Sequence, residues 1–141
     1  IHVNIQQREP VLRVLTGEGY YVDRDGRVMP LSSKFTSRVV VATGDINKKF
    51  ACEKLGPFAM KLKNEPFWDA YIEQLVVRSN EDVVMIPKVG DFRIVLGKVD
   101  DCEARLEKLM LFLKDGITKK GWNRYKEINL KFDNQVVCVR K

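Results

Sequence analysis

Short runs of alternating or continuous apolar residues, separated by turn residues, recur along this chain and constrain its fold more than any other feature. Ile1, Val3 and Ile5 alternate with polar residues, and the stretches VLRVLT and SRVVVATG are further runs of this kind. An apolar residue at every second position is typical of a β-strand with one buried face. The chain is therefore predicted to form mainly β-strands.

Turn residues divide these runs into hairpins. Asp25-Gly26 interrupts the stretch GYYVDRDGRVMPL, and Gly90-Asp91 interrupts DVVMIPKVGDFRIVLG. A glycine supplies the positive φ that a tight hairpin turn requires. The segment from Asp23 to Gly26 also resembles the start of a calcium loop, but the third acidic position and the closing Glu are missing. We interpret it as a hairpin turn.

Two segments have helical periodicity. Residues 47–63 carry apolar side chains at helical spacing, with a possible kink at Pro57, and residues 99–115 carry a second apolar stripe. Asp100 and Asp101 would open the second helix, where carboxylates complement the positive N-terminus, and Gly116 would end it. The apolar positions are Phe50, Ala51, Leu55, Phe58, Ala59 and Leu62 in the first helix, and Cys102, Leu106, Leu109, Met110 and Leu113 in the second.

One segment is ambiguous. The stretch PFWDAYIEQLVVRS, residues 66–79, fits a helix by its spacing, but IEQLVVRS also has high strand propensity. In either case the order of elements predicts an α+β fold, a mostly antiparallel or mixed sheet with two amphipathic helices packed on it. With 141 residues and 45% hydrophobic content, the chain can form a core without metal or disulfide cross-links.

The closing stretch INLKFDNQVVCVRK is the most β-prone part of the chain. Ile128, Leu130 and Phe132 alternate with polar residues, 133–135 form a turn, and 136–139 are apolar at every position. The first half predicts a strand with one solvated face, and the second predicts a strand covered on both faces. A terminal strand without protection can pair with a strand from another chain.

Few residues of the sequence suggest a catalytic or metal-binding site. His2 is the only histidine, and Cys52, Cys102 and Cys138 lack metal-ligand spacing, so they are predicted to be buried small hydrophobic residues with at most one disulfide. No catalytic residue, metal or cofactor is predicted. The net charge of +6, from 25 basic and 19 acidic residues, leaves a basic module for nucleic acid or an acidic polymer as an alternative to a protein-binding module.

Four motifs in order resemble the extracytoplasmic part of the FtsQ/DivIB family of bacterial division proteins. They are Arg8 with Pro10-Val11, then Tyr21-Val22-Asp23 with Gly26, then Leu96-Gly97 with Arg105-Leu106, and finally Ile128 to Asn134. The chain departs from the family pattern in having Asn129 for Asp, Lys131 for Arg, Phe132 for Tyr and Gln135 for Gly. All four departures lie in the closing hairpin. They change the residue type in its turn and remove a guanidinium and a phenol hydroxyl that a family contact could use.

The resemblance implies both an organisation and a function. Residues 1–16 would be the last strand and exit of a truncated POTRA domain, and residues 17–141 an FtsQ-type β domain, with PFWDAY as a short helical turn and IEQLVVRS as a strand. The longer protein would be held in the inner membrane by one N-terminal helix, with this region in the periplasm at the division septum.

The family's partners are implied in the same way. The protein would bind FtsB/DivIC-like and FtsL-like proteins by strand addition. The implied contact residues are Lys131, Phe132 and Asn134 around the turn and Val136, Val137, Cys138, Val139 and Arg140 along the last strand.

Overall fold

The computed structural model describes residues 10–17, 19–30, 39–88, 92–100, 102–114, 125–131 and 137–140. Within them nine strands form one sheet in the order β3-β2-β1-β4-β5-β6-β7-β8-β9. The strands are β1 Pro10–Val14, β2 Tyr20–Asp23, β3 Val28–Pro30, β4 Val40–Gly44, β5 Ile72–Arg78, β6 Asp82–Pro87, β7 Arg93–Gly97, β8 Tyr125–Asn129 and β9 Val137–Arg140.

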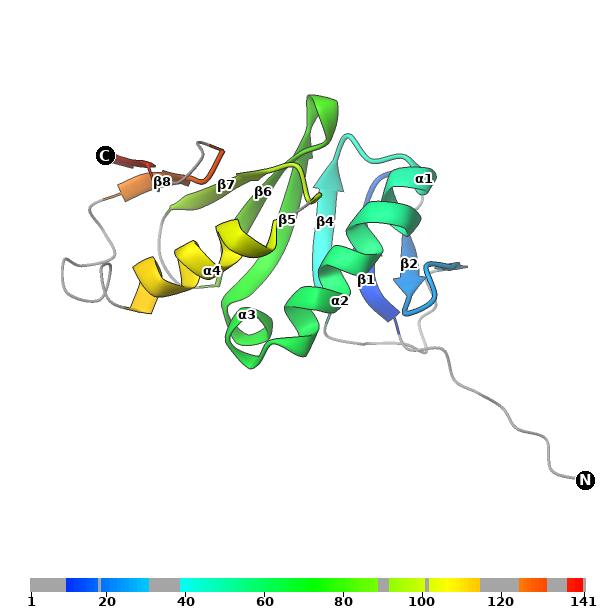
Figure 1. Cartoon of the computed structure of the whole chain (residues 1–141). Helices are drawn as coiled ribbons and strands as arrows, with labels where there is room; N and C mark the ends of the chain where they lie inside the picture. Colours follow the sequence, from blue (N-terminus) through cyan, green and yellow to red (C-terminus); the bar gives the residue numbers. More distant parts are fainter. Residues whose placement is uncertain are drawn as a thin grey trace, which may run out of the picture.

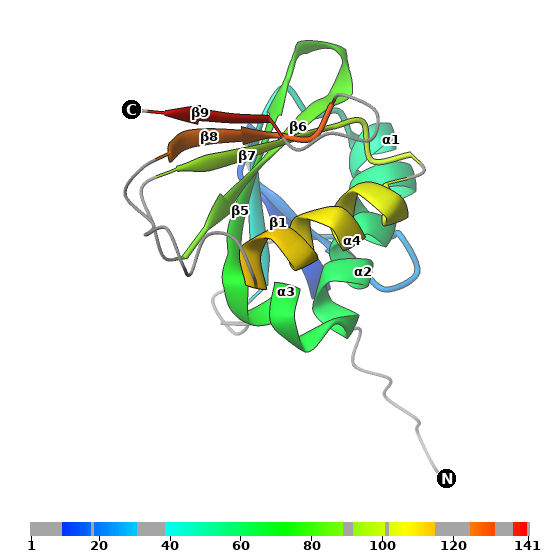
Figure 2. The same ribbon diagram turned by 60° about the vertical axis from the view of Figure 1, so that its left-hand side comes forward.

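The sheet is mixed, which confirms the predicted α+β class. Three neighbouring pairs are parallel, β1 with β4, β4 with β5 and β7 with β8, and the other five are antiparallel. A parallel pair needs a long connection between its strands, usually one that contains a helix. Here α1 to α3 lie between β4 and β5 along the chain, and α4 lies between β7 and β8. In both views these helices lie on one face of the sheet (Figure 1, Figure 2).

The first predicted helix, residues 47–63, is confirmed. It consists of α1 Lys48–Phe50, the π-helical segment η1 Ala51–Leu55 and α2 Gly56–Asn64, and Asn47 caps it by accepting a hydrogen bond from the Phe50 N–H at 2.7 Å. Pro57 has no N–H and its ring disfavours a regular α-turn before it. The wider π-turn, in which the Gly56 N–H bonds to the Ala51 carbonyl, lies just before this proline.

The ambiguous segment divides into a short helix and a strand, as the family resemblance implied. α3 spans Pro66–Tyr71 and β5 follows directly from Ile72. β5 lies between β4 and β6 in the sheet, and Leu75 and Val77 are buried in the core. Pairing with β4 and β6 therefore makes this segment a strand, which the spacing of its apolar residues alone could not predict.

The second predicted helix is shorter at its start than expected. α4 spans Glu103–Phe112, and Cys102 precedes it without a side-chain cap. The prediction that Asp100 opens the helix is wrong, because this carboxylate lies before it and pairs with Lys54 at 2.6 Å. Leu106 and Leu109 are buried, as predicted. Asp101 and Gly116 lie outside the described residues.

The core fills the space between the helices and one face of the sheet. Most strands direct alternate residues into it, as predicted, but β1 places the adjacent Val11 and Leu12 there and β5 has a register shift after Ile72. Examples are Leu12 and Val14 on β1, Leu75 and Val77 on β5, and Ile94 and Leu96 on β7. None of the helices in the described part of the chain is long and apolar enough to span a membrane.

The predicted hairpin at Asp25-Gly26 is confirmed. β2 pairs antiparallel with β3, and Gly26 has a φ of 76°. The buried Asp23 carboxylate accepts hydrogen bonds from the N–H groups of Asp25 and Arg27 at 2.9 and 2.8 Å. Its Oδ1 atom thus accepts hydrogen bonds from two backbone N–H groups of the turn, as expected of an aspartate at this position.

The N-terminal strand of residues 1–5 lies outside the described residues. β1, which corresponds to the predicted strand in VLRVLT, pairs with β2 and β4 within the sheet. The division into residues 1–16 and 17–141 stays a prediction.

Candidate functional site

Strand β9 is outermost at one end of the sheet and pairs with β8 alone among the described residues. The pairing is antiparallel, with Ile128 opposite Cys138 and Asn129 opposite Val137. Figure 2 shows both strands at this margin of the molecule, β8 in orange and β9 in red. On its outer side an edge strand carries main-chain N–H and C=O groups that no neighbouring strand binds. β9 is therefore a surface on which a further strand can pair.

The side chains of β9 are less covered than the sequence predicted. Val137, Cys138 and Val139 are all half-buried, so the expectation of a strand covered on both faces is wrong for these residues. An outermost strand has a neighbouring strand on one side only. Cys138 packs against the core beside the helices, whereas Val137 and Val139 point to the opposite face because strand side chains alternate.

β8 starts and ends before the strand predicted from Ile128 to Phe132. It begins at Tyr125 and ends at Asn129. The Asn129 side chain accepts a hydrogen bond from the Lys131 N–H at 2.9 Å, while the Leu130 N–H still donates to the Val95 carbonyl at 2.8 Å. An asparagine side chain that binds the backbone two residues later competes with the strand ladder. This contact accounts for the end of β8.

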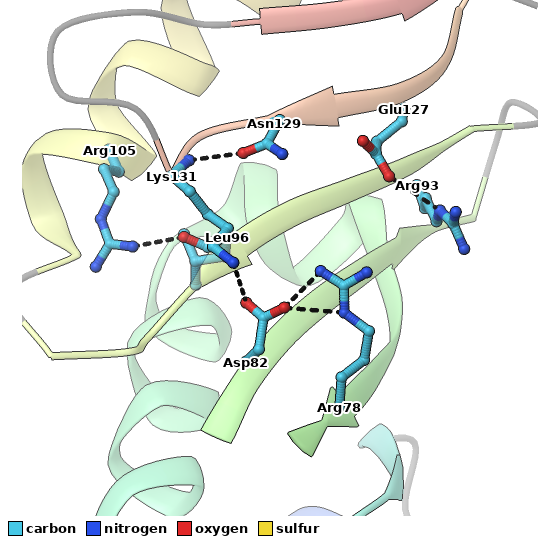
Figure 3. A network of polar contacts seen from close by, with 8 residues as sticks. All are labelled: Arg78, Asp82, Arg93, Leu96, Arg105, Glu127, Asn129 and Lys131. Carbon is cyan, nitrogen blue, oxygen red and sulfur yellow. Dashed lines mark hydrogen bonds and ion pairs between the residues drawn. The ribbon is translucent and has the colours of Figure 1, made fainter. Parts of the chain in front are cut away.

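An ionic network joins the end of β8 to the start of β6 (Figure 3). The Asp82 carboxylate accepts hydrogen bonds from Nε and Nη2 of Arg78 at 2.9 and 2.5 Å. Its other oxygen lies 3.6 Å from Nζ of Lys131. The Asp82 side chain is only 15% exposed, against 48% for Lys131. A shielded carboxylate thus has a cation on either side.

Gly97, at the end of β7, makes room for this network. Its φ is +90°, and a Cβ built there would lie 3.1 Å from Cγ of Lys131 and 3.2 Å from Nη1 of Arg105. The Arg105 guanidinium, on α4, donates to the carbonyls of Leu96, Lys98 and Asp100 at 2.5, 2.6 and 2.8 Å. Gly97 and Arg105 belong to one of the motifs that carried the family resemblance, and the structure gives both a structural role.

A second ion pair lies nearer to β9. Arg93 Nε on β7 is 3.4 Å from Oε1 of Glu127 on β8, and the two residues are direct neighbours in the parallel ladder. Glu127 is in turn opposite Val139. On the face away from the helices, Val139 therefore has a carboxylate beside it, and a residue added next to Val139 would lie close to that charge.

The predicted contact residues are only partly within the described chain. Lys131 follows β8, and Val137, Cys138, Val139 and Arg140 form β9. Phe132, Asn134 and Val136 lie outside the described residues.

Sequence reasoning missed Asp82, and it named Arg105 only as part of a family motif without predicting its contacts. The available signal for Asp82 was its spacing of four residues from Arg78 across the turn-like Ser79-Asn80. No local signal indicated that Lys131 approaches Asp82, since the two lie far apart in the chain.

The three cysteines are free thiols. Cys102 is buried, as predicted. Cys52 and Cys138 are only half-buried, so the prediction that all three cysteines are buried is wrong for these two. Burial raises the pKa of the Cys102 thiol, and burial, followed by the nearby Asp23 carboxylate, raises the pKa of Cys52. Both thiols stay protonated at neutral pH, which makes them poor nucleophiles.

A cavity of about 640 Å³ lies between the start of β4 and helices α2 and α3. Its wall combines the buried Trp68 with charges of both signs, Lys63 and Lys88 against Asp69 and Glu73. Mixed charges of this kind select neither an anion nor a cation. Within the described ranges no three His, Cys, Asp or Glu side chains are grouped to hold a metal ion.

Comparison with known families gives one match. The family model described as FtsQ/DivIB, C-terminal related, matches residues 9–139. No curated protein matches the chain. The matched range includes every strand of the sheet in whole or nearly so, and it contains the β8–β9 hairpin.

Proposed function

Because the chain belongs to the FtsQ/DivIB C-terminal related family of cell-division proteins, we propose that it is a non-enzymatic scaffold that binds its partners by strand addition at β9. The partners are division proteins of the FtsB/DivIC and FtsL types. The contact includes Lys131, Phe132 and Asn134 around the turn, and Val136 to Arg140 along the strand.

The observation that carries this proposal is the difference between the two edges of the sheet. The β3 edge is three residues long and ends at Pro30, which has no N–H to donate. The β9 edge is four residues long and contains no proline. Natural sheets protect edges with short strands and prolines. Both edge strands are short, and within the described residues only the β9 edge contains no proline.

Main-chain pairing alone would give weak binding. About half of the N–H and C=O groups of a four-residue strand point outward, and each hydrogen bond contributes about 1 kcal/mol net. The total is a few kcal/mol, whereas a micromolar complex needs about 8 kcal/mol. Side chains must supply the difference, and Val137 and Val139 on one face and Cys138 on the other are half-buried positions that an added strand would cover.

Several cations of the described surface lie in ion pairs, which leaves fewer of them to meet a polyanion and so favours a protein partner. Lys54 pairs with Asp100, Lys61 with Glu103, and Arg93 with Glu127. A basic surface that binds nucleic acid needs cations free to meet phosphates. Binding by strand addition should accordingly change little with salt, whereas binding to a polyanion should weaken steeply as salt rises.

The organisation and location of the longer protein belong to the same proposal. Residues 1–16 form the end of a POTRA domain and residues 17–141 the β domain. An N-terminal helix anchors the protein in the inner membrane, and this region lies in the periplasm at the division septum. These statements follow the family and account for a sheet edge that faces other division proteins.

Proline substitution tests the binding site. Adjacent strand residues direct their N–H groups to opposite sides, so one of the two variants Val137→Pro and Cys138→Pro removes an outward donor from β9. We expect that variant to weaken binding of the partner's periplasmic segment at least tenfold by calorimetry, with the sheet still folded by circular dichroism.

The matched control is Val28→Pro on the opposite edge, which should leave affinity unchanged. Full affinity in both β9 variants would refute the proposed site. Loss of affinity in the β3 variant alone would move the contact to the other edge, and a steep salt dependence of wild-type binding would favour the polyanion.

A further inference from the structure

The end of β8 is held by three separate contacts that meet at Lys131. Its N–H is bound by the Asn129 side chain at 2.9 Å, its aliphatic stem passes over Gly97, and its ammonium group lies 3.6 Å from the Asp82 carboxylate. Lys131 is also the residue from which the connection to β9 begins. A constraint on Lys131 is thus a constraint on where the edge strand starts.

The contact with Asp82 spans the sheet. Asp82 begins β6, Lys131 follows β8, and β7 lies between these strands. Neighbouring strands are about 4.8 Å apart, so the two main chains are separated by roughly 10 Å. The Lys131 side chain can cross β7 only where β7 has no side chain of its own on that path, and Gly97 supplies this gap. Figure 3 shows the side chain of Lys131 directed toward Asp82.

The surroundings of the Asp82 carboxylate favour its contact with Lys131. Arg78 binds one oxygen through two N–H groups, which holds that oxygen in place. Among the described residues the other oxygen has no hydrogen-bond partner, and it is directed to the Lys131 ammonium group. With an exposure of 15%, this carboxylate is screened less by water than a surface residue would be.

From these contacts we propose that Asp82 is a positioning residue for the partner-binding edge: it holds Lys131 against β7 and so fixes the base of the β8–β9 hairpin. On this view Lys131 faces its own sheet, so among the contact residues proposed above its role is to position the edge strand and not to touch the partner. A fixed edge strand loses less conformational freedom when a partner strand pairs with it, which increases affinity. The effect on partner binding rests on the proposed function, but the effect on the hairpin does not.

A double-mutant cycle tests the inference. Asp82→Asn keeps the size of the side chain and removes its charge, and Lys131→Met keeps a stem over Gly97 and removes the ammonium group. The first readout, hydrogen exchange of those β9 amides that are bonded to β8, needs no partner. We expect each single variant to speed this exchange by about two- to fivefold, as the loss of a partly exposed ion pair implies, and the double variant to exchange no faster than either one.

The control variant is Lys61→Met, which removes the Lys61–Glu103 pair on the helical side of the molecule. It should leave the exchange of the β9 amides unchanged. Core amides of Leu75 and Met85 should be equally protected in all variants, which shows that the sheet stays folded. Unchanged β9 exchange in Asp82→Asn, or independent additive effects of the two substitutions, would overturn the inference.

Partner affinity is the second readout and separates two roles for Lys131. If Asp82 positions the edge, the two single variants lose affinity by the same factor and the double variant loses no more. If Lys131 instead contacts the partner, Lys131→Met loses affinity while Asp82→Asn retains it, which refutes the positioning role. Absence of binding by the wild-type chain would refute the proposed function, and the exchange data would still decide the inference.

Discussion

Nζ of Lys131 lies 3.6 Å from Oδ1 of Asp82, so that a residue just after β8 is joined to the first residue of β6 across the intervening strand. Arg78 binds the same carboxylate from β5. Residues from three parts of the chain thereby hold the base of the closing hairpin. The contact is an ion pair with an exposed cation, so its expected contribution is modest, about 0.2–1 kcal/mol.

Replacing Gly97 with alanine should disturb this region more than strain alone would. Its φ of +90° disfavours any side chain, and the new Cβ would meet Lys131 and Arg105. We expect a loss of about 1–3 kcal/mol in the free energy of unfolding, measured by urea denaturation, together with faster exchange of the β9 amides.

Gly17→Ala is the matched control for that substitution. Gly17 also has a positive φ, +67°, but nothing lies within 4 Å of a Cβ built there. It should cost less stability and leave β9 exchange unchanged. Equal effects of the two substitutions would show that Gly97 matters only for its backbone conformation.

Lys131→Arg should strengthen the base of the hairpin. A guanidinium group holds its N–H donors in a fixed planar fork and can aim one of them at a carboxylate oxygen, whereas an ammonium group is a point charge. The free oxygen of Asp82 is available for such a bond. We expect exchange of the β9 amides to slow by about twofold, consistent with a gain of a few tenths of a kcal/mol. Faster exchange would mean that the longer side chain does not fit over Gly97.

Asp23 should prove essential to the first hairpin through its acceptor atom and not through its charge. Its Oδ1 accepts from two turn N–H groups. Asp23→Ala should therefore lower the free energy of unfolding by about 1–3 kcal/mol, while Asp23→Asn, which keeps an oxygen, should lose much less. Calcium should not raise the melting temperature of the wild-type chain. A rise that disappears in Asp23→Asn would restore the calcium-loop interpretation.

The Cys102 thiol should make stability fall at alkaline pH. Burial raises its pKa in the folded state, so the unfolded chain loses this proton first as pH increases. The contribution is complete below about pH 8.5, the ordinary pKa of a thiol, and is lost progressively above it. We expect the free energy of unfolding to decline between pH 8 and 10, and to decline less in Cys102→Ala. A decline in Cys102→Ala as steep as that of the wild type would contradict the prediction.

Local pattern predicted the hairpin at Asp25-Gly26 and the helix from residue 47 correctly, because turn chemistry and helical spacing act within a few residues. It failed at the start of α4, where Asp100 pairs with Lys54 from another helix. It also left residues 66–79 open, because the choice between helix and strand depends on whether β4 and β6 are there to pair with β5.

The candidate site could likewise be predicted only in part from the sequence. The β-prone character of the closing stretch could be predicted, since apolar and β-branched residues favour strands wherever they lie. The half-buried state of Val137 to Val139 could not, because it depends on β9 being outermost. The burial pattern of a strand is a property of its place in the sheet.

The sequence by itself determined the helix from residue 47, the hairpin at Asp25-Gly26 and the family to which the chain belongs. Only the tertiary structure decided which strand forms the edge and brought Asp82, Gly97, Arg105 and Lys131 together at the end of β8. Propensity and turn preference act between near neighbours in the chain. The order of strands and the ion pairs across them depend on contacts between residues far apart in sequence, which form only when the whole sheet is assembled.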